Sequence, residues 1–241
     1  MAMSLSLMAE AQLVDDFSGS LSAYTLSRVL DNDTTANVSF SNSTGALQAN
    51  ATATSQAEQV LFLRNDYSLA VGQMLSATIN WSLAGSQDLG ICVASTATPT
   101  TVPNGSTGNT RTSLSYCFIG IRSSADHVVA SGFDGATGLS TLQYQPGGAN
   151  TTADVFIART SATTFTLGYN PNGTGDVTLG TYTFANSANV GNAIGFYSDM
   201  RSAGSIGTFD NLTISPIPEP STLALCGAGC MGMLGFFRRK K

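Results

Sequence analysis

The chain is poor in charged residues, and lysine is almost missing from it. Charged residues make up 10% of its 241 positions, and the two lysines, Lys240 and Lys241, are the last two residues. Residues 12–215 hold six arginines against twelve aspartates and one glutamate, a net charge of −7. Because nucleic-acid binding needs a basic face, this composition excludes nucleic acid as a partner.

Histidine and glutamate are also scarce, which excludes several classes of enzyme. The single histidine, His127, cannot form a zinc site without cysteine or further histidine ligands. The chain also lacks the Gly-x-Ser-x-Gly elbow that a serine hydrolase using this histidine would need. Glu58 is the one glutamate of residues 12–215. No glycine-rich phosphate loop precedes a helix, so nucleotide chemistry is not expected.

What the chain does contain is 42% hydrophobic residues and 25 glycines, arranged as short runs rich in β-branched and aromatic residues. Residues 164–169, TFTLGY, alternate apolar and small polar side chains, the period of a half-buried strand. Runs of this kind, separated by Gly, Asn, Ser, Asp and Pro, predict strands at 59–64, 74–81, 89–94, 113–122, 154–159, 164–169, 177–184, 193–198 and 208–214, and several of them alternate in this way. Many short strands without an amphipathic helix predict one all-β sandwich domain.

The C-terminus has three parts. The motif Pro218-Glu219-Pro220 is followed by an uncharged stretch, residues 223–237, and then by Arg238, Arg239, Lys240 and Lys241. As a helix the uncharged stretch would span about 22 Å, less than the hydrocarbon core of a bilayer. The basic end favours the cytoplasmic side, so the body would lie outside the membrane. A buried core helix is the alternative, although the glycines of the stretch disfavour it.

This tail resembles the PEP-CTERM sorting signal of bacteria. The resemblance implies export by the Sec machinery and transient anchoring in the inner membrane. It also implies recognition of Pro218, Glu219 and Pro220 by exosortase, with residues 238–241 as the membrane stop. The protein would then reach the cell surface or the extracellular matrix, for example that of a biofilm.

The N-terminus points to export less directly. Residues 9–11, Ala-Glu-Ala, match a small-x-small cleavage site, but the basic and long apolar regions of a signal peptide are missing. We therefore interpret residues 1–11 as the remnant of a signal peptide that begins upstream, with an ordinary N-terminus as the alternative. The expected division is 1–11, a β-sandwich domain at 12–215, and the sorting signal at 216–241.

The body carries a second resemblance. Residues 155–159, 165–169, 190–198 (VGNAIGFYS) and 207–212 (GTFDNL) are similar in order to the last strands of concanavalin A-like, or laminin G-like, jelly rolls. Residues 15–17 match the first strand, which in that fold pairs with the last. The resemblance implies a two-sheet antiparallel sandwich. Its glucanase-like members use a Glu-x-Asp-x-Glu strand, which is absent here. We therefore expect a non-catalytic protein that binds carbohydrate or acts as an adhesin, with a polysaccharide hydrolase as the alternative.

Two cysteines form a candidate disulfide. Cys92 and Cys117 flank the loop between two predicted strands, and a hairpin would place them roughly opposite each other. In an exported protein such a bridge would contribute about 3 kcal/mol. Two small buried apolar side chains are the alternative.

Two further sets of residues are candidate ligands. Trp81, Tyr144, Tyr169 and Asn170 could stack on a sugar and bind its hydroxyls, or could be ordinary core and edge residues. Asp15, Asp16, Asp199 and Asp210 come from chain ends that the jelly roll would bring together. Carboxylates suit a structural calcium, although solvated edge aspartates are the simpler interpretation. No other cofactor is expected.

Overall fold

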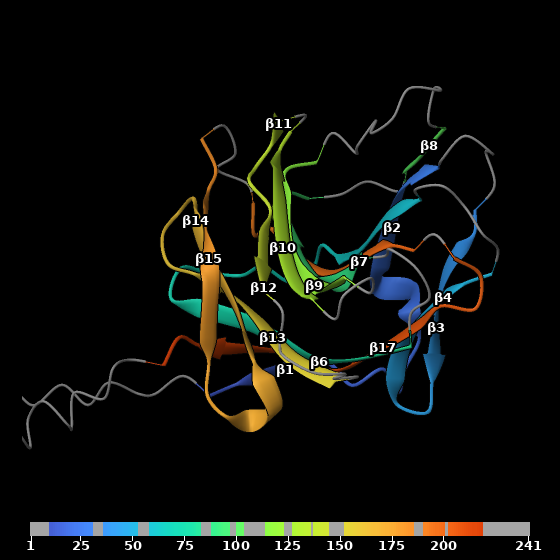
Figure 1. The fold of residues 1–241 in the computed structure, drawn as a ribbon, viewed down its shortest axis with the longest axis horizontal. Coiled ribbons are helices and arrows are strands. Elements are labelled where there is room, and N and C mark those ends of the chain that lie inside the picture. The colour runs from blue at the N-terminus through green and yellow to red at the C-terminus, as the bar shows by residue number, and fades with distance from the viewer. Residues whose placement is uncertain are drawn as a thin grey trace, which may run out of the picture.

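The computed structural model describes residues 10–30, 36–52, 58–82, 88–96, 100–103, 114–122, 127–135, 137–144, 152–185, 190–200 and 202–218. Within them the chain forms two β-sheets that pack face to face (Figure 1), with short 3-10 helices at Leu21–Ala23 and Pro171–Gly173. The predicted all-β two-sheet sandwich is therefore confirmed. All strand pairs are antiparallel except β2 with β8.

The eight-stranded sheet has the order β15-β14-β13-β6-β17-β4-β3, and β1 also pairs with β17. Its strands are β1 (Gln12–Asp15), β3 (Val38–Ser43), β4 (Ala46–Ala51), β6 (Gln73–Ser82), β13 (Thr152–Arg159), β14 (Thr164–Asn170), β15 (Val177–Thr183) and β17 (Ile206–Pro216). The expectation that the first strand pairs with the last is confirmed, because Asp15 lies opposite Leu212.

The nine-stranded sheet has the order β11-β10-β9-β7-β16-β5-β2-β8, and β12 also pairs with β10. Its strands are β2 (Tyr24–Leu30), β5 (Gln59–Arg64), β7 (Asp88–Ala94), β8 (Thr100–Pro103), β9 (Tyr116–Arg122), β10 (His127–Asp134), β11 (Thr137–Gly138), β12 (Leu142–Tyr144) and β16 (Ala193–Asp199). Figure 1 shows this sheet curving, so that β10 and β11 on one side and β2 and β8 on the other rise above its middle strands.

The main core lies between the sheets. Alternate residues of β6 are buried there, as expected for a strand with one covered face. Residues with no exposed surface in this layer include Leu47, Ile79, Leu89, Ile119, Ile157, Phe196 and Phe209.

The middle strands of the nine-stranded sheet are buried on both faces. Every residue of β7 and of β16 is buried. A second apolar layer therefore covers the face turned away from the eight-stranded sheet, which we call the concave face. Its buried members are Leu61, Leu63, Cys92, Ala94, Tyr116, Phe118, Val129, Phe133, Ala193 and Tyr197.

The structure corrects the predicted disulfide, because Cys92 and Cys117 are free and buried. Strands β7 and β9 do pair, but Val93 lies opposite Cys117, and Cys92 lies opposite Phe118. An offset of one residue turns a side chain to the other face of a sheet. Cys117 therefore lies in the core between the sheets and Cys92 on the concave face. Burial raises the pKa of both thiols.

The chain leaves the fold at the end of β17. The backbone N–H of Ile217 still donates to the carbonyl of Gly72, and Pro218 is exposed. Glu219, Pro220, the predicted transmembrane helix and the basic residues 238–241 lie outside the described residues, as do residues 1–9. In the described part of the chain, no helix is long and apolar enough to cross a membrane.

Candidate functional site

Five neighbouring strands each contribute one polar residue to a single line across the concave face. Asp199 on β16 lies opposite both Gln59 on β5 and Asp88 on β7. Asp88 in turn lies opposite Arg122 on β9, and Arg122 lies opposite His127 on β10. We call these five residues the polar row. It exists because β16 is inserted between β5 and β7, which brings together residues far apart in the sequence.

One bidentate ion pair orders the middle of the polar row. The Nε of Arg122 donates to Oδ1 of Asp88 at 2.6 Å, and its Nη2 donates to Oδ2 at 2.6 Å. The hydrogen bond to Asp88 raises the pKa of the Arg122 guanidinium, and the negative charge of Asp199 acts in the same direction. Two parallel hydrogen bonds hold the guanidinium in one orientation. The row therefore carries two carboxylates and one fixed cation.

Stacked aromatic rings lie beside the polar row. The ring centroids of Phe118 and Tyr197 are 3.9 Å apart, and the two ring planes are inclined at 12°. Tyr116 lies 5.1 Å from Phe133 and 5.8 Å from Tyr197, measured between ring centroids. Such contacts stabilise each pair by about 0.5–1.5 kcal/mol beyond the burial of the rings. The four aromatic residues therefore form a preorganised apolar wall.

Two glycines leave room for this wall. Gly90 on β7 lies opposite Gly120 on β9, and Tyr197 lies opposite Gly90. A Cβ atom on Gly120 would lie 1.9 Å from the carbonyl oxygen of Leu89. The two strands therefore approach too closely for a side chain at either glycine position.

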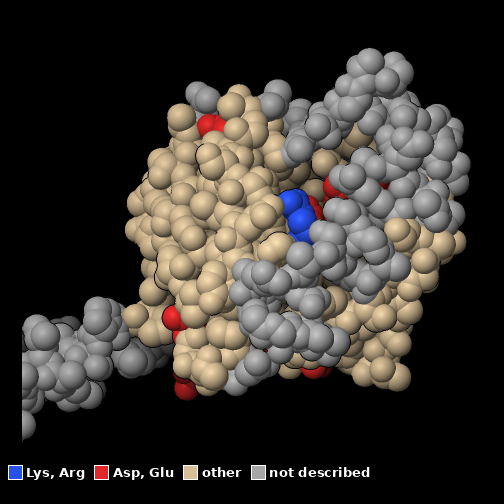
Figure 2. Space-filling view, viewed as in Figure 1, with Lys and Arg blue, Asp and Glu red and all other residues tan. Residues whose placement is uncertain are grey.

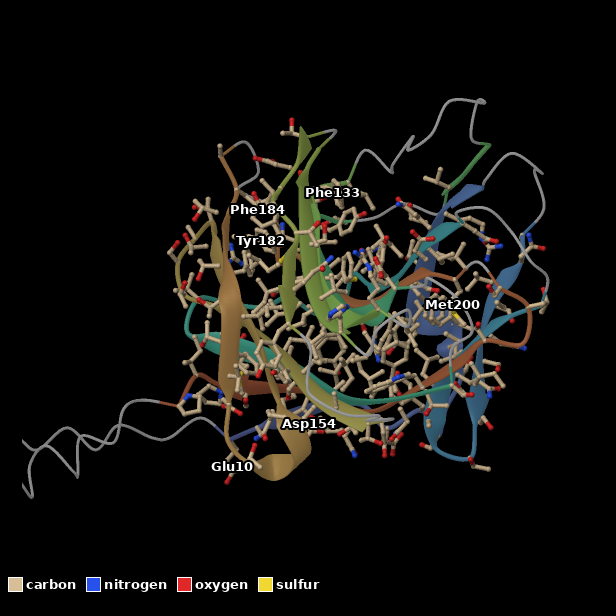
Figure 3. The ribbon with its side chains drawn as sticks, in the orientation of Figure 1. Glu10, Phe133, Asp154, Tyr182, Phe184 and Met200 are labelled. Carbon is tan, nitrogen blue, oxygen red and sulfur yellow. The ribbon has the colours of Figure 1, made fainter. Side chains whose placement is uncertain are left out.

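Four residues of the polar row and three of the aromatic residues line a pocket of about 270 Å³ on the concave face. Its lining residues are Gln59, Asp88, Phe118, Arg122, Ser131, Phe133, Gly138, Leu139, Thr141, Tyr197 and Asp199. Figure 2 shows a face that is mostly uncharged, with basic and acidic atoms in contact near its centre. Phe133 lies in the upper part of Figure 3, on the side toward which the nine-stranded sheet curves.

Gln59 is the exceptional residue of this pocket. The residue is 8% exposed, and its amide oxygen Oε1 is buried without a hydrogen-bond partner. Leaving a buried acceptor unsatisfied costs about 1–3 kcal/mol. A ligand with a hydroxyl or amine donor would supply the missing partner.

The residues predicted to bind sugar do not form one site. Trp81 and Tyr169 are 8% and 1% exposed and belong to the core between the sheets. Tyr144 is 48% exposed, and its ring lies 5.5 Å from that of Tyr169. The side chain of Asn170 accepts from the N–H of Gly175 and so holds a turn. The simpler interpretation, core and edge residues, describes them better.

The predicted calcium residues do not gather either. Oδ2 of Asp15 lies 3.2 Å from Nη1 of Arg64 and accepts a hydrogen bond from the hydroxyl of Tyr24. Oδ1 of Asp16 accepts a hydrogen bond from the backbone N–H of Ser18. Asp199 lies on the other sheet, in the polar row. Among the described residues, no three His, Cys, Asp or Glu side chains are placed to hold a metal ion. The proposed set of four is therefore corrected.

Comparison with known proteins identifies the tail. Residues 216–241 match the model of the PEP-CTERM protein-sorting motif, the range predicted for it. The motif implies exosortase processing, export and sorting to the cell surface. A comparison with curated protein sequences finds no match.

Comparison with solved structures identifies the fold of the body. Lectin II from Ulex europaeus is 12% identical, with a TM-score of 0.56 over 87% of this chain and 99% of its own. Lectin I-B4 from Griffonia simplicifolia is 10% identical, with a TM-score of 0.56 over 87% of this chain and 100% of its own. The exoplasmic/lumenal domain of VIP36 is 7% identical, with a TM-score of 0.54 over 87% of this chain and 89% of its own.

Both resemblances seen in the sequence are thus confirmed. The chain has a concanavalin A-like lectin fold followed by a C-terminal PEP-CTERM sorting motif.

Proposed function

We propose that this is an exported bacterial protein that exosortase processes at its tail, and that binds carbohydrate through the concave pocket at the cell surface or in the extracellular matrix. The sorting motif supports the destination. The lectin fold supports the ligand class, since the Ulex lectin has been solved with galactose and the VIP36 domain with Man3GlcNAc.

The observation that carries the proposal is the unpartnered Oε1 of Gln59 in the pocket. It lies in one row with the Asp88–Arg122 pair, beside the stacked rings of Phe118 and Tyr197. Acceptors and a cation suit the hydroxyls of a sugar, and an aromatic wall suits the apolar face of its ring. A mostly preformed pocket with a few convergent polar groups is typical of small-molecule sites.

The test is a glycan array probed with the full chain and with Gln59→Met. Methionine has nearly the shape of glutamine but cannot accept this hydrogen bond. We expect the native chain to bind a defined set of saccharides and the variant to bind them at least about tenfold more weakly. Gln12→Met, on an exposed residue of β1, is the matched control. Equal binding by both variants and the native chain would contradict the pocket assignment.

A hydrolase is the second candidate, and one observation favours it. Asp88 and Asp199 lie directly opposite each other, which places their Cβ atoms about 5 Å apart. Retaining glycosidases hold two carboxyl groups at about 5–5.5 Å. Against this, Arg122 occupies both carboxylate oxygens of Asp88, so that group is not free to attack.

A hydrolysis assay separates the two candidates. We expect no new reducing ends when the saccharides that bind are incubated with the chain. Turnover that disappears in Asp199→Asn would establish the hydrolase instead.

The tail is tested by replacing Pro218, Glu219 and Pro220 with alanine. Because the sorting motif implies recognition by exosortase, we expect the variant to stay in the inner membrane. Unchanged surface display would contradict the proposed sorting.

A further inference from the structure

The second feature of interest is the face of the eight-stranded sheet that is turned away from the core, which we call the outer face. Register places six of its residues in one row across six strands: Leu13, Thr213, Ser76, Phe156, Gly168 and Thr178. Phe156 is the aromatic residue of this row, and Asp154, two residues away on the same face, lies at the bottom of Figure 3, far from Phe133.

Phe156 extends over a neighbouring glycine on the outer face. Its two neighbours across the sheet are the small residues Ser76 and Gly168. A Cβ atom on Gly168 would lie 2.3 Å from Cζ of Phe156 and 2.8 Å from its Cε1. The tip of the Phe156 ring therefore lies over Gly168, in the space that a side chain there would fill. Phe156 is still partly exposed, so part of its ring is available to solvent.

Hydroxyl and amide groups surround this ring in regular cross-strand pairs. Thr78 donates to Asp154 at 2.6 Å. The other pairs are Thr152 with Asn80, Thr164 with Thr183, and Thr166 with Thr181. None of the four described arginines belongs to these rows. Two carboxylates do belong to them, Asp154 and, opposite Thr78, Asp210. The surface around the Phe156 ring is therefore rich in hydroxyl groups and weakly acidic, which disfavours an anionic ligand.

Protection of Gly168 would by itself explain an aromatic residue at position 156, because aromatic rings often cover strand glycines. That structural role does not explain the hydroxyl-bearing pairs on both sides of the ring. The apolar face of a pyranose ring can pack against the exposed part of the Phe156 ring, while its hydroxyls meet the neighbouring Thr and Asp side chains. Because the surface is open and extended, it suits a long polymer better than one terminal sugar.

We propose that the outer face, centred on Phe156, is a second carbohydrate-contact surface that binds an extended, uncharged polysaccharide. The inference rests on the proposed function for its class of ligand, but the surface shares no residue with the concave pocket. The two surfaces lie on opposite faces of the sandwich. One molecule would therefore link two polysaccharide chains, which raises avidity without any new contact.

The test measures binding of the full chain to two insoluble β-1,4-linked polymers, microcrystalline cellulose and chitin. The first variant, Phe156→Leu, keeps an apolar side chain over Gly168 but removes the flat ring, and Phe156→Trp keeps a ring. We expect the leucine variant to bind roughly three- to tenfold more weakly and the tryptophan variant to bind at least as well as the native chain. The matched control is Thr25→Ala, on β2 of the other sheet.

A second variant keeps the test valid if Phe156→Leu does not fold. Thr178 is exposed on the edge strand β15, next to Gly168 in the row. Thr178→Arg places a long side chain beside the ring and leaves the packing intact, and we expect it to reduce polymer binding to the same degree.

The outcomes distinguish this surface from the concave pocket. Polymer binding that persists in Gln59→Met but falls in the Phe156 or Thr178 variants supports the second surface. No polymer binding by the native chain, or polymer binding unchanged in Phe156→Leu and Thr178→Arg, overturns it, whatever the glycan array shows. The proposed function fails separately, if the array shows no binding that depends on Gln59.

Discussion

Asp88 on β7 lies directly opposite Asp199 on β16, and the guanidinium of Arg122 binds both carboxylate oxygens of Asp88 at 2.6 Å. Like charges in opposite positions destabilise a sheet. The Arg122 cation offsets that repulsion, so the pocket can keep two carboxylates on its floor. The same ion pair places one positive and one negative group, held in a fixed orientation, in the pocket where we expect the sugar to bind.

Removing the cation should therefore destabilise the fold. In Arg122→Met the carboxylate of Asp88, with a side chain 11% exposed, stays without its partner beside Asp199. We expect a loss of about 3 kcal/mol in the free energy of unfolding, measured by urea denaturation. The double variant Asp88→Asn with Arg122→Met should recover part of it. A single variant as stable as the native chain would contradict this account of the row.

The close approach of β7 and β9 predicts that a side chain at Gly120 severely destabilises the fold. A Cβ atom there would meet the carbonyl oxygen of Leu89 at 1.9 Å, and the backbone of a central strand cannot move away. We expect Gly120→Ala to cost more than about 4 kcal/mol, or to prevent folding. Gly45→Ala is the control: φ is +82° with open space around it, so we expect a loss of only about 1 kcal/mol. Thermal unfolding compares the two, and equal losses would count against the close approach of β7 and β9.

The two body cysteines should resist both oxidation and alkylation. They lie on opposite faces of the sheet, and burial raises the pKa of each thiol. Peptide mapping after iodoacetamide treatment should find Cys92 and Cys117 unmodified in the native protein and alkylated after unfolding. A peptide in which the two are disulfide-linked, isolated from the exported protein under non-reducing conditions, would refute the register between β7 and β9.

Buried tyrosines predict a loss of stability in alkali. Burial is the largest factor that raises the pKa of Tyr169 from its ordinary value of 10.0 to about 12. It also raises the pKa of Tyr182, whose hydroxyl donates to the carbonyl of Ala130 at 2.8 Å. The unfolded chain releases these protons first, so their stabilisation is complete below pH 10 and falls as the pH rises toward 12. Tyr169→Phe should flatten the decline in unfolding free energy between these values. An unchanged slope would show that Tyr169 titrates normally.

The sequence predicted part of the sandwich from strands that have one covered face. In β6, β13 and β14 the alternation of apolar and polar residues is a local property that can be read without knowing their neighbours. Strand β10 was missed, since His127–Asp134 mixes small, polar and apolar residues without clear alternation.

The concave pocket could not be predicted in the same way. Gln59, Asp88 and Asp199 meet only because β16 lies between β5 and β7, and strand order is not a local property of the sequence. A register error of one residue turned Cys92 and Cys117 into an apparent pair. The sequence also left open whether Trp81 and Tyr169 lie at the surface or in the core, because the side that a strand buries depends on which sheet covers it.

The most direct test of the central claim is a crystal structure of the protein with the saccharide that binds best on the array. We expect the sugar in the concave pocket, with one hydroxyl donating to Oε1 of Gln59 and a ring face turned toward Phe118 and Tyr197. A sugar bound elsewhere, with that oxygen still unpartnered in the complex, would contradict the claim.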